Sequence, residues 1–357
     1  MWNPHLALAP KFALSHFCGV HKMIDDTFEL EENRLKREIL RRRAKKVLLQ
    51  LPEGLKPEGP RLAALIDNVG ATAVISGDPC YGACDLPLCE AESLGVDLIV
   101  HYGHSKMMMN DKSPVPIVYI EAKANLDIRA AVEEAIGHLR PWSRIGLATT
   151  VQHIHMIHEA RQILKQAGKT VYLGDAGHAK YPGQVLGCDF SNARSVSDKV
   201  EAFLFVGGGR FHAIGLSLAT MKPTIVADPF EKRAYSVEAD AQKIVRRRWA
   251  EINGAKEAGK FGVIIGLKPG QCNIDAAIGI KQALEENGKR AVLLALHEVT
   301  STTLLQFPTI EAYVNTACPR IALDEPSFLT KPVLTVREAY VALGKIRWED
   351  LLEEGFM

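Results

Sequence analysis

The chain has 357 residues, of which 47% are hydrophobic and 24% are charged, a composition typical of a globular protein with two or three domains. Its formal net charge of +1 gives no overall field that would favour nucleic acid or a membrane surface as a partner. No apolar run is long enough to span a bilayer, so the sequence excludes an integral membrane protein.

Residues 1–22 read as an N-terminal extension, because they carry charged residues and lack the cleavage site of a signal peptide. A charged helix is predicted over residues 29–46. Seven cysteines in a chain without an export signal favour a cytoplasmic protein, in which thiols are ligands or core residues rather than disulfides.

The first third of the chain then alternates strands with a helix. A buried parallel strand is predicted at residues 47–50, and the helix after it ends at Gly70, since glycine is a usual C-terminal stop. Further strands are predicted at residues 71–76, at residues 97–101 and from Pro116 onwards.

The middle and last thirds repeat this order with even spacing. The predicted elements are strand 145–148, helix 157–166, strands 170–173, 202–206 and from Pro223, then strand 262–265, helix 276–287, strands 290–296, 311–314 and from Pro332. A second charged helix, over residues 231–260, lies between these two thirds and includes Arg246, Arg247 and Arg248. We interpret it as a solvated helix with one apolar stripe, and a basic patch for an acidic partner is the alternative.

The repeat predicts an α/β protein with three homologous small domains, each with a mostly parallel four-stranded sheet, around a pseudo-threefold centre. We expect residues 1–45 to form the extension and first helix, and residues 46–140 to form the first domain. Residues 141–256 form the second domain with its trailing helix, and residues 257–357 the third with a C-terminal tail. One large doubly wound sheet is the alternative.

Three cysteines, Cys84, Cys188 and Cys318, each lie in a loop beyond a predicted strand of a different repeat. Ligands of open α/β sheets bind beyond the carboxyl ends of the strands, so the three thiols are predicted to meet at the centre. Three thiolates without a fourth protein ligand favour an iron–sulfur cluster with one open iron. A Cys3His zinc site is the alternative, its histidine being one of four near the rim: His101, His104, His178 and His212.

A local set of cysteines competes with this centre. Cys80, Cys84 and Cys89 have the spacing C-x3-C-x4-C, which departs from the C-x3-C-x2-C of the usual radical S-adenosylmethionine loop. The local set would also leave Cys188 and Cys318 without a role. We therefore predict that Cys80 and Cys89 are not ligands.

Three loops are predicted to line the same cavity and to bind a small molecule. The first contains Gly207, Gly208, Gly209 and Arg210 after the third strand of the middle repeat, where glycines let backbone N–H groups approach a carboxylate or phosphate. The other two contain Glu53 and Gln271, after the first strands of the outer repeats.

Five segments resemble the archaeal diphthamide synthase family: QLPEGL, GDPCYGACD, VLGCDFSNA, FVGGGRFHA and NTACPRIALDE. The resemblance runs from about residue 47 to about residue 337 and leaves the N-terminal extension outside. It implies a 4Fe-4S cluster held by the cysteines of YGAC, LGC and ACPR, which are Cys84, Cys188 and Cys318.

The resemblance also implies a reaction. A non-conventional radical SAM enzyme binds S-adenosylmethionine, its co-substrate, at the open iron and cleaves it to a 3-amino-3-carboxypropyl radical and methylthioadenosine. The radical adds to C2 of a histidine imidazole in translation elongation factor 2, the first step of diphthamide biosynthesis. An electron donor and a homodimer are the other partners that the family implies.

Two other functions stay open at this point. Quinolinate synthase also has three repeated α/β domains and a cluster with an open iron, which acts as a Lewis acid in a dehydration. A non-catalytic metal-binding partner subunit is the second. The YGAC and ACPR contexts favour the transferase.

Overall fold

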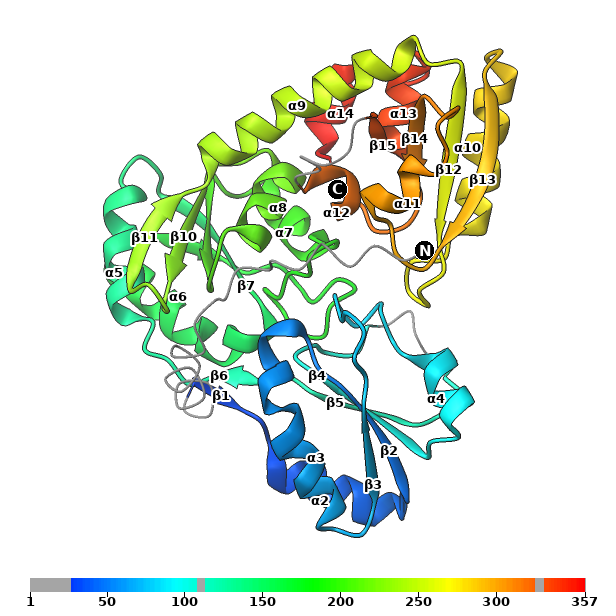
Figure 1. The fold of residues 1–357 in the computed structure, drawn as a ribbon. Helices are drawn as coiled ribbons and strands as arrows, with labels where there is room; N and C mark the ends of the chain where they lie inside the picture. Colours follow the sequence, from blue (N-terminus) through cyan, green and yellow to red (C-terminus); the bar gives the residue numbers. More distant parts are fainter. Residues whose placement is uncertain (1–26, 108–112, 325–330, 357) are drawn as a thin grey trace, which may run out of the picture.

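The computed structural model describes residues 27–107, 113–324 and 331–356, and contains three large sheets in separate parts of the molecule (Figure 1). Their strands are mostly parallel, so the predicted α/β class is confirmed. A short antiparallel ribbon of β1 (Phe28–Glu29) and β6 (Lys123–Ala124) lies between the first and middle sheets. Among the described residues, none of the helices combines the length and apolar character needed to cross a membrane.

The first sheet has the strand order β3-β2-β4-β5. Its strands are β2 (Lys46–Gln50), β3 (Thr72–Ile75), β4 (Leu98–Tyr102) and β5 (Ile117–Ile120). Its helices are α2 (Glu32–Arg42), the 3-10 helix η2 (Glu53–Glu58), α3 (Gly59–Asp67) and α4 (Leu88–Leu94). The charged helix predicted first is α2, which buries Leu35 and Ile39 in the core of this sheet.

The middle sheet has the order β11-β10-β9-β7-β8. Its strands are β7 (Arg144–Thr149), β8 (Thr170–Tyr172), β9 (Ala202–Val206), β10 (Thr224–Asp228) and β11 (Arg233–Ser236). The helices around it are α5 (Arg129–His138), η3 (Val151–Met156), α6 (Ile157–Gln166), α7 (Ser191–Ser197) and α8 (Phe211–Thr220).

The third sheet has the order β13-β12-β14-β15. Its strands are β12 (Lys260–Gly266), β13 (Arg290–Leu296), β14 (Ala312–Asn315) and β15 (Val333–Thr335). Its helices are α9 (Glu238–Lys256), α10 (Ile274–Glu286), α11 (Ser301–Leu305), α12 (Arg320–Leu323), α13 (Val336–Ala342) and α14 (Trp348–Glu354).

The internal repeat is visible in the strand orders. In each sheet the first strand in sequence pairs with the second on one side and the third on the other, and the fourth follows the third. The three predicted proline starts are also confirmed, since β5, β10 and β15 each begin one residue after the proline. The domain boundaries and the pseudo-threefold arrangement of the sheets stay predictions.

The middle sheet departs from the predicted four strands, because β11 adds a fifth, antiparallel strand to β10. The sequence indicated a charged helix from residue 231, but the helix α9 starts only at Glu238. The Asp228 side chain accepts from the backbone N–H of Phe230 and Glu231, which turns the chain back on itself. Ala234 then packs into the core of the sheet, so tertiary contact overrides the helical composition.

The helix α9 runs from the middle sheet to the third and connects their cores (Figure 1). Its arginines do not form one solvated patch, because Arg248 is fully buried and paired with Glu338 at 2.6 Å. Arg248 also donates to the backbone carbonyls of Ala322 and Val333. This residue therefore ties α9 to the third sheet, and the basic-patch alternative loses one of its three arginines.

Candidate functional site

A cavity of about 630 Å³ lies where loops of the three sheets meet. The loops come from the carboxyl ends of parallel strands, the edge at which such sheets bind ligands. Cys84, Cys188 and Cys318 all line this cavity, and they follow β3, β8 and β14 respectively. The structure thus brings together the three cysteines that the repeat singled out.

The three thiols are partly buried and none forms a disulfide. Burial, together with the neighbouring Cys318 and Cys84 thiolates, raises the pKa of the Cys188 thiol to about 12. Burial likewise raises the pKa of Cys84 and of Cys318. Three thiolates this close together repel one another. A bound metal cation would offset this repulsion and keep all three thiols deprotonated.

The loop after β12 holds the Cys84 loop in place. Gly270 N–H donates to the Cys84 carbonyl at 2.8 Å, and a Cβ at position 270 would lie 2.5 Å from the Cβ of Cys84, so only glycine fits. Gln271 Nε2 lies 3.4 Å from Cys84 Sγ. Lys268 pairs with Asp85 at 2.9 Å, so the first and third sheets are joined directly beside the thiol.

The local set of cysteines is dispersed. Cys80 is buried outside the lining of the cavity, and Cys89 is exposed on α4. Burial, with the neighbouring carboxylates of Asp85 and Glu53, raises the pKa of Cys80 to about 12. This placement favours the set with one cysteine from each sheet.

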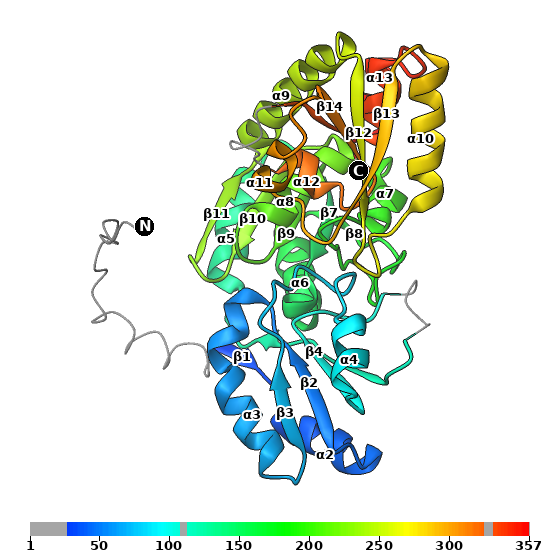
Figure 2. The ribbon, with the colours of Figure 1, turned by 45° about the vertical axis from the view of Figure 1, so that its right-hand side comes forward.

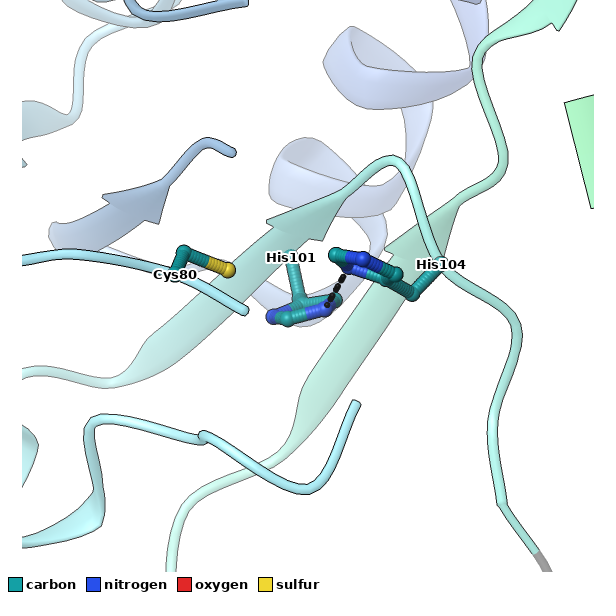
Figure 3. A group of neighbouring side chains, drawn as sticks. All are labelled: Cys80, His101 and His104. Atoms are coloured by element: carbon teal, nitrogen blue, oxygen red, sulfur yellow. Dashed lines mark hydrogen bonds between the residues drawn. The ribbon is translucent and has the colours of Figure 1, made fainter. Parts of the chain in front are cut away.

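The four rim histidines occupy different places. His104 and His212 line the cavity, whereas His101 is buried behind His104 and bonded to it. His178 lies on the surface, 2.7 Å from Asp189. Cys80, His101 and His104 form a compact group (Figure 3).

The residues predicted to bind the small molecule divide into two sets. Gln271 lines the cavity, whereas Glu53 and Gly207–Arg210 are not among the described residues that line it. Gly209 N–H bonds to Asp228, and Arg210 pairs with Asp240 on the surface. Glu53 accepts from Cys80 N–H and pairs with Lys56. The ligand roles of all these residues stay predictions.

Sequence reasoning missed one residue of the cavity, Arg320. It is 7% exposed, stacks on the Phe211 ring at 3.7 Å and pairs with Asp324 through Nε and Nη2. Its buried Nη1 has no hydrogen-bond partner among the described residues. A Cβ at Gly215 of α8 would lie 2.9 Å from this nitrogen, so Nη1 packs against α8. The guanidinium as a whole is a cation in the cavity lining and a suitable partner for an anion. Its place two residues after Cys318, in ACPR, was the available signal.

Comparison with a family model places the chain among known proteins. Residues 51–352 match the model described as "Putative diphthamide synthesis protein". The matched segment includes all three cavity cysteines.

Individual relatives agree with this match. The chain is 38% identical over 318 residues to the 2-(3-amino-3-carboxypropyl)histidine synthase of Pyrococcus horikoshii, covering 88% of this chain and 91% of the relative. It is 30% identical over 343 residues to subunit 1 of that synthase from Schizosaccharomyces pombe, covering 94% of this chain and 78% of the relative.

A solved structure shares the fold. Dph2 from Pyrococcus horikoshii, crystallised with a 4Fe-4S cluster, superposes with a TM-score of 0.83 at 36% identity. The match covers 90% of this chain and 92% of that one.

Proposed function

Because the chain belongs to the family of diphthamide synthesis proteins, we propose that it is a 3-amino-3-carboxypropyl transferase. The group comes from S-adenosylmethionine and goes to C2 of a histidine imidazole in translation elongation factor 2, with release of methylthioadenosine. The reaction is the first step of diphthamide biosynthesis, proceeds by a radical path and takes place in the cytoplasm.

One observation carries this proposal: three cysteines, one from each sheet, line a single cavity. The donor set fits a 4Fe-4S cluster, because thiolates are the ligands that iron–sulfur centres use and three of them leave one iron open. Cys84, Cys188 and Cys318 would hold the cluster. When bound, it supplies the open iron and the electron for cleaving the bond between sulfur and the γ-carbon.

The protein's own residues orient the co-substrate and keep water out. The cavity is lined mostly by apolar side chains and backbone, and Arg320, two residues after Cys318, is a cation in this lining. The methionine end of S-adenosylmethionine carries a carboxylate, which matches this donor. We therefore assign the carboxylate to Arg320, and we propose that Gln271, beside Cys84, is a second contact of the co-substrate.

Replacing Arg320 with methionine should weaken S-adenosylmethionine binding about 10- to 100-fold, because a hydrogen bond to a charged group is worth about 1.5–3 kcal/mol. Methionine keeps most of the packing on Phe211. Calorimetry on the anaerobic cluster-loaded protein measures the change. The exposed Arg347→Met is the matched control, and unchanged affinity in Arg320→Met with a full cluster would contradict the assignment.

The reaction itself is tested by anaerobic reconstitution with iron and sulfide, followed by reduction in the presence of S-adenosylmethionine. We expect methylthioadenosine, and transfer of the carboxypropyl group when elongation factor 2 is present. A dehydratase would form no methylthioadenosine, and a non-catalytic metal-binding subunit would not bind S-adenosylmethionine.

We also propose that the protein is a homodimer joined through β13. This strand is the outer edge of the third sheet (Figure 2) and is apolar from Ala291 to Leu296, with Val292 50% exposed and Leu293 37% exposed. The equivalent edges β3 and β8 are shorter, at four and three residues against seven. A long edge strand that is apolar after its first residue favours pairing with a second copy, which would continue the sheet.

Val292→Lys should therefore weaken the dimer about 100-fold or more, because it puts a charge in the middle of the apolar edge strand that the second copy would cover. Light scattering after size exclusion measures the mass. Thr72→Lys, on the equivalent edge β3, is the control and should stay dimeric. A monomeric wild-type protein, or a Val292→Lys variant that remains a dimer, would contradict an interface through β13.

A further inference from the structure

Three hydrogen-bonded side chains lead from the core of the first sheet to the cavity. His104 Nδ1 and His101 Nε2 lie 2.9 Å apart (Figure 3), and His101 Nδ1 lies 2.6 Å from Gln50 Oε1. Gln50 ends β2 and His101 lies in β4, so two neighbouring strands fix the inner part of the chain. Both are buried, whereas His104 lines the cavity.

The direction of each hydrogen bond follows from its neighbours. Gln50 Nε2 donates to the Asp85 carbonyl at 2.6 Å, which turns Oε1 toward His101. His101 must therefore donate from Nδ1, so its Nε2 carries a lone pair and accepts from His104 Nδ1–H. The His104 ring also has a hydrogen bond to the Tyr102 backbone. With its proton on Nδ1, His104 keeps a lone pair on Nε2 and can accept a proton there.

A metal ion is the competing explanation for this group. The ligand atoms of Cys80, His101 and His104 lie within 4.8 Å of one another. Two nitrogens on a tetrahedral zinc would lie about 3.3 Å apart, farther than the hydrogen-bonded 2.9 Å observed between the two rings. The contacts thus favour a hydrogen-bonded chain over a metal site.

The proposed reaction requires a proton acceptor. The electron pair of the sulfonium C–S bond ends on sulfur in methylthioadenosine. At the imidazole, the C2–H bond breaks and its proton leaves, and a new C–C bond joins C2 to the carboxypropyl group. The overall balance is the same for a radical and an ionic path, and it consumes no net oxidant. A base at the cavity must take this proton.

The other basic groups of the cavity are less suited to this role. Glu298 is paired with Lys268 at 2.6 Å and Asp324 with Arg320 at 2.5 Å, so each of these carboxylates is already engaged by a cation. His212 packs against the rings of Phe205 and Phe211. His104 is the histidine of the cavity that a second and a third side chain orient, as in the arrangement of a base with its supporting groups.

We propose that His104 Nε2 accepts the proton released from C2 of the acceptor imidazole, and that His101 and Gln50 position His104. This inference rests on the proposed function and deepens it. It assigns the base to the loop that follows β4 of the first sheet.

Burial supports the availability of His104. It lowers the pKa of His104 to about 4 and that of His101 well below its usual value. Both rings are therefore neutral at physiological pH, and His104 does not need to lose a proton before it accepts one.

The test compares His104→Ala and Gln50→Leu with the wild-type protein and with His138→Ala, an exposed control. Three readouts are taken on cluster-loaded protein: iron content, methylthioadenosine formed without acceptor, and transfer to elongation factor 2. Transfer should fall about 100-fold or more in His104→Ala, within the usual range for a lost general base, while iron content and cleavage stay unchanged. Added imidazole should partly restore it.

Acceptor deuterated at the histidine C2 provides the readout for the positioning residues. Both variants should show a larger isotope effect on transfer than the wild type, because proton removal becomes slower, and a structural defect alone would not change it. The proposal would be overturned if His104→Ala transferred the group normally, if it lost cleavage together with transfer, or if imidazole did not restore transfer. So would a stoichiometric non-iron metal that is lost in Cys80→Ala. Wild-type protein that forms no methylthioadenosine would contradict the proposed function instead.

Discussion

Replacing Cys188 with alanine should abolish the iron–sulfur cluster. Cys188 is the contribution of the middle sheet to the cavity, and the two remaining thiols would leave half of a four-iron cluster without protein ligands. Iron and sulfide content after anaerobic reconstitution should fall to background, together with the visible absorbance of the cluster. Methylthioadenosine formation should disappear with it.

The matched controls are Cys80→Ala and Cys89→Ala, which remove the other two cysteines of the Cys84 loop region. Cys80 is buried away from the cavity lining and Cys89 is exposed, so both variants should retain the cluster. A cluster that survives in Cys188→Ala and is lost in Cys80→Ala would contradict a centre with one cysteine from each sheet. It would favour a cluster held by Cys80, Cys84 and Cys89 in one loop region.

Arg248→Met should destabilise the protein by about 3–5 kcal/mol, the usual cost of removing one partner of a buried ion pair. Arg248 and Glu338 are 0% and 1% exposed, and Arg248 makes four hydrogen bonds. Its loss would leave the Glu338 carboxylate buried beside two unpaired backbone carbonyls. Urea denaturation followed by circular dichroism measures the change.

Arg246→Met is the control for this stability prediction. Arg246 lies two residues away on the same helix but is exposed, so the free energy of unfolding should change by no more than about 0.5 kcal/mol. If Arg248→Met and Arg246→Met had the same free energy of unfolding, the ion pair of Arg248 with Glu338 would stabilise the protein no more than the packing of a methionine does.

The elements that sequence reasoning predicted well are those with a local physical cause. Buried parallel strands need continuous apolar runs, which is why residues 47–50, 145–148 and 262–265 coincide with β2, β7 and β12. A proline precedes each fourth strand because proline has no backbone N–H and therefore cannot donate a hydrogen bond within a sheet. The cavity cysteines were found because strand ends converge in such sheets.

The features that escaped sequence reasoning depend on distant partners. Arg246 and Arg248 are the same residue type on one helix, yet one is solvated and the other lies in the core of the third sheet. Nothing local distinguishes them, because the partner Glu338 is 90 residues away. The same holds for Arg320, whose stacking on Phe211 is set by the docking of the middle sheet against the third.

The separation of the three cavity cysteines has a consequence for how the protein matures. Cys84 and Cys318 belong to the first and last sheets, so most of the chain must be synthesised and docked before their thiols share one cavity. A nascent or proteolysed chain that lacks its last sheet cannot present the full ligand set. If the proposed cluster is bound as we infer, its insertion would therefore have to follow the docking of the last sheet.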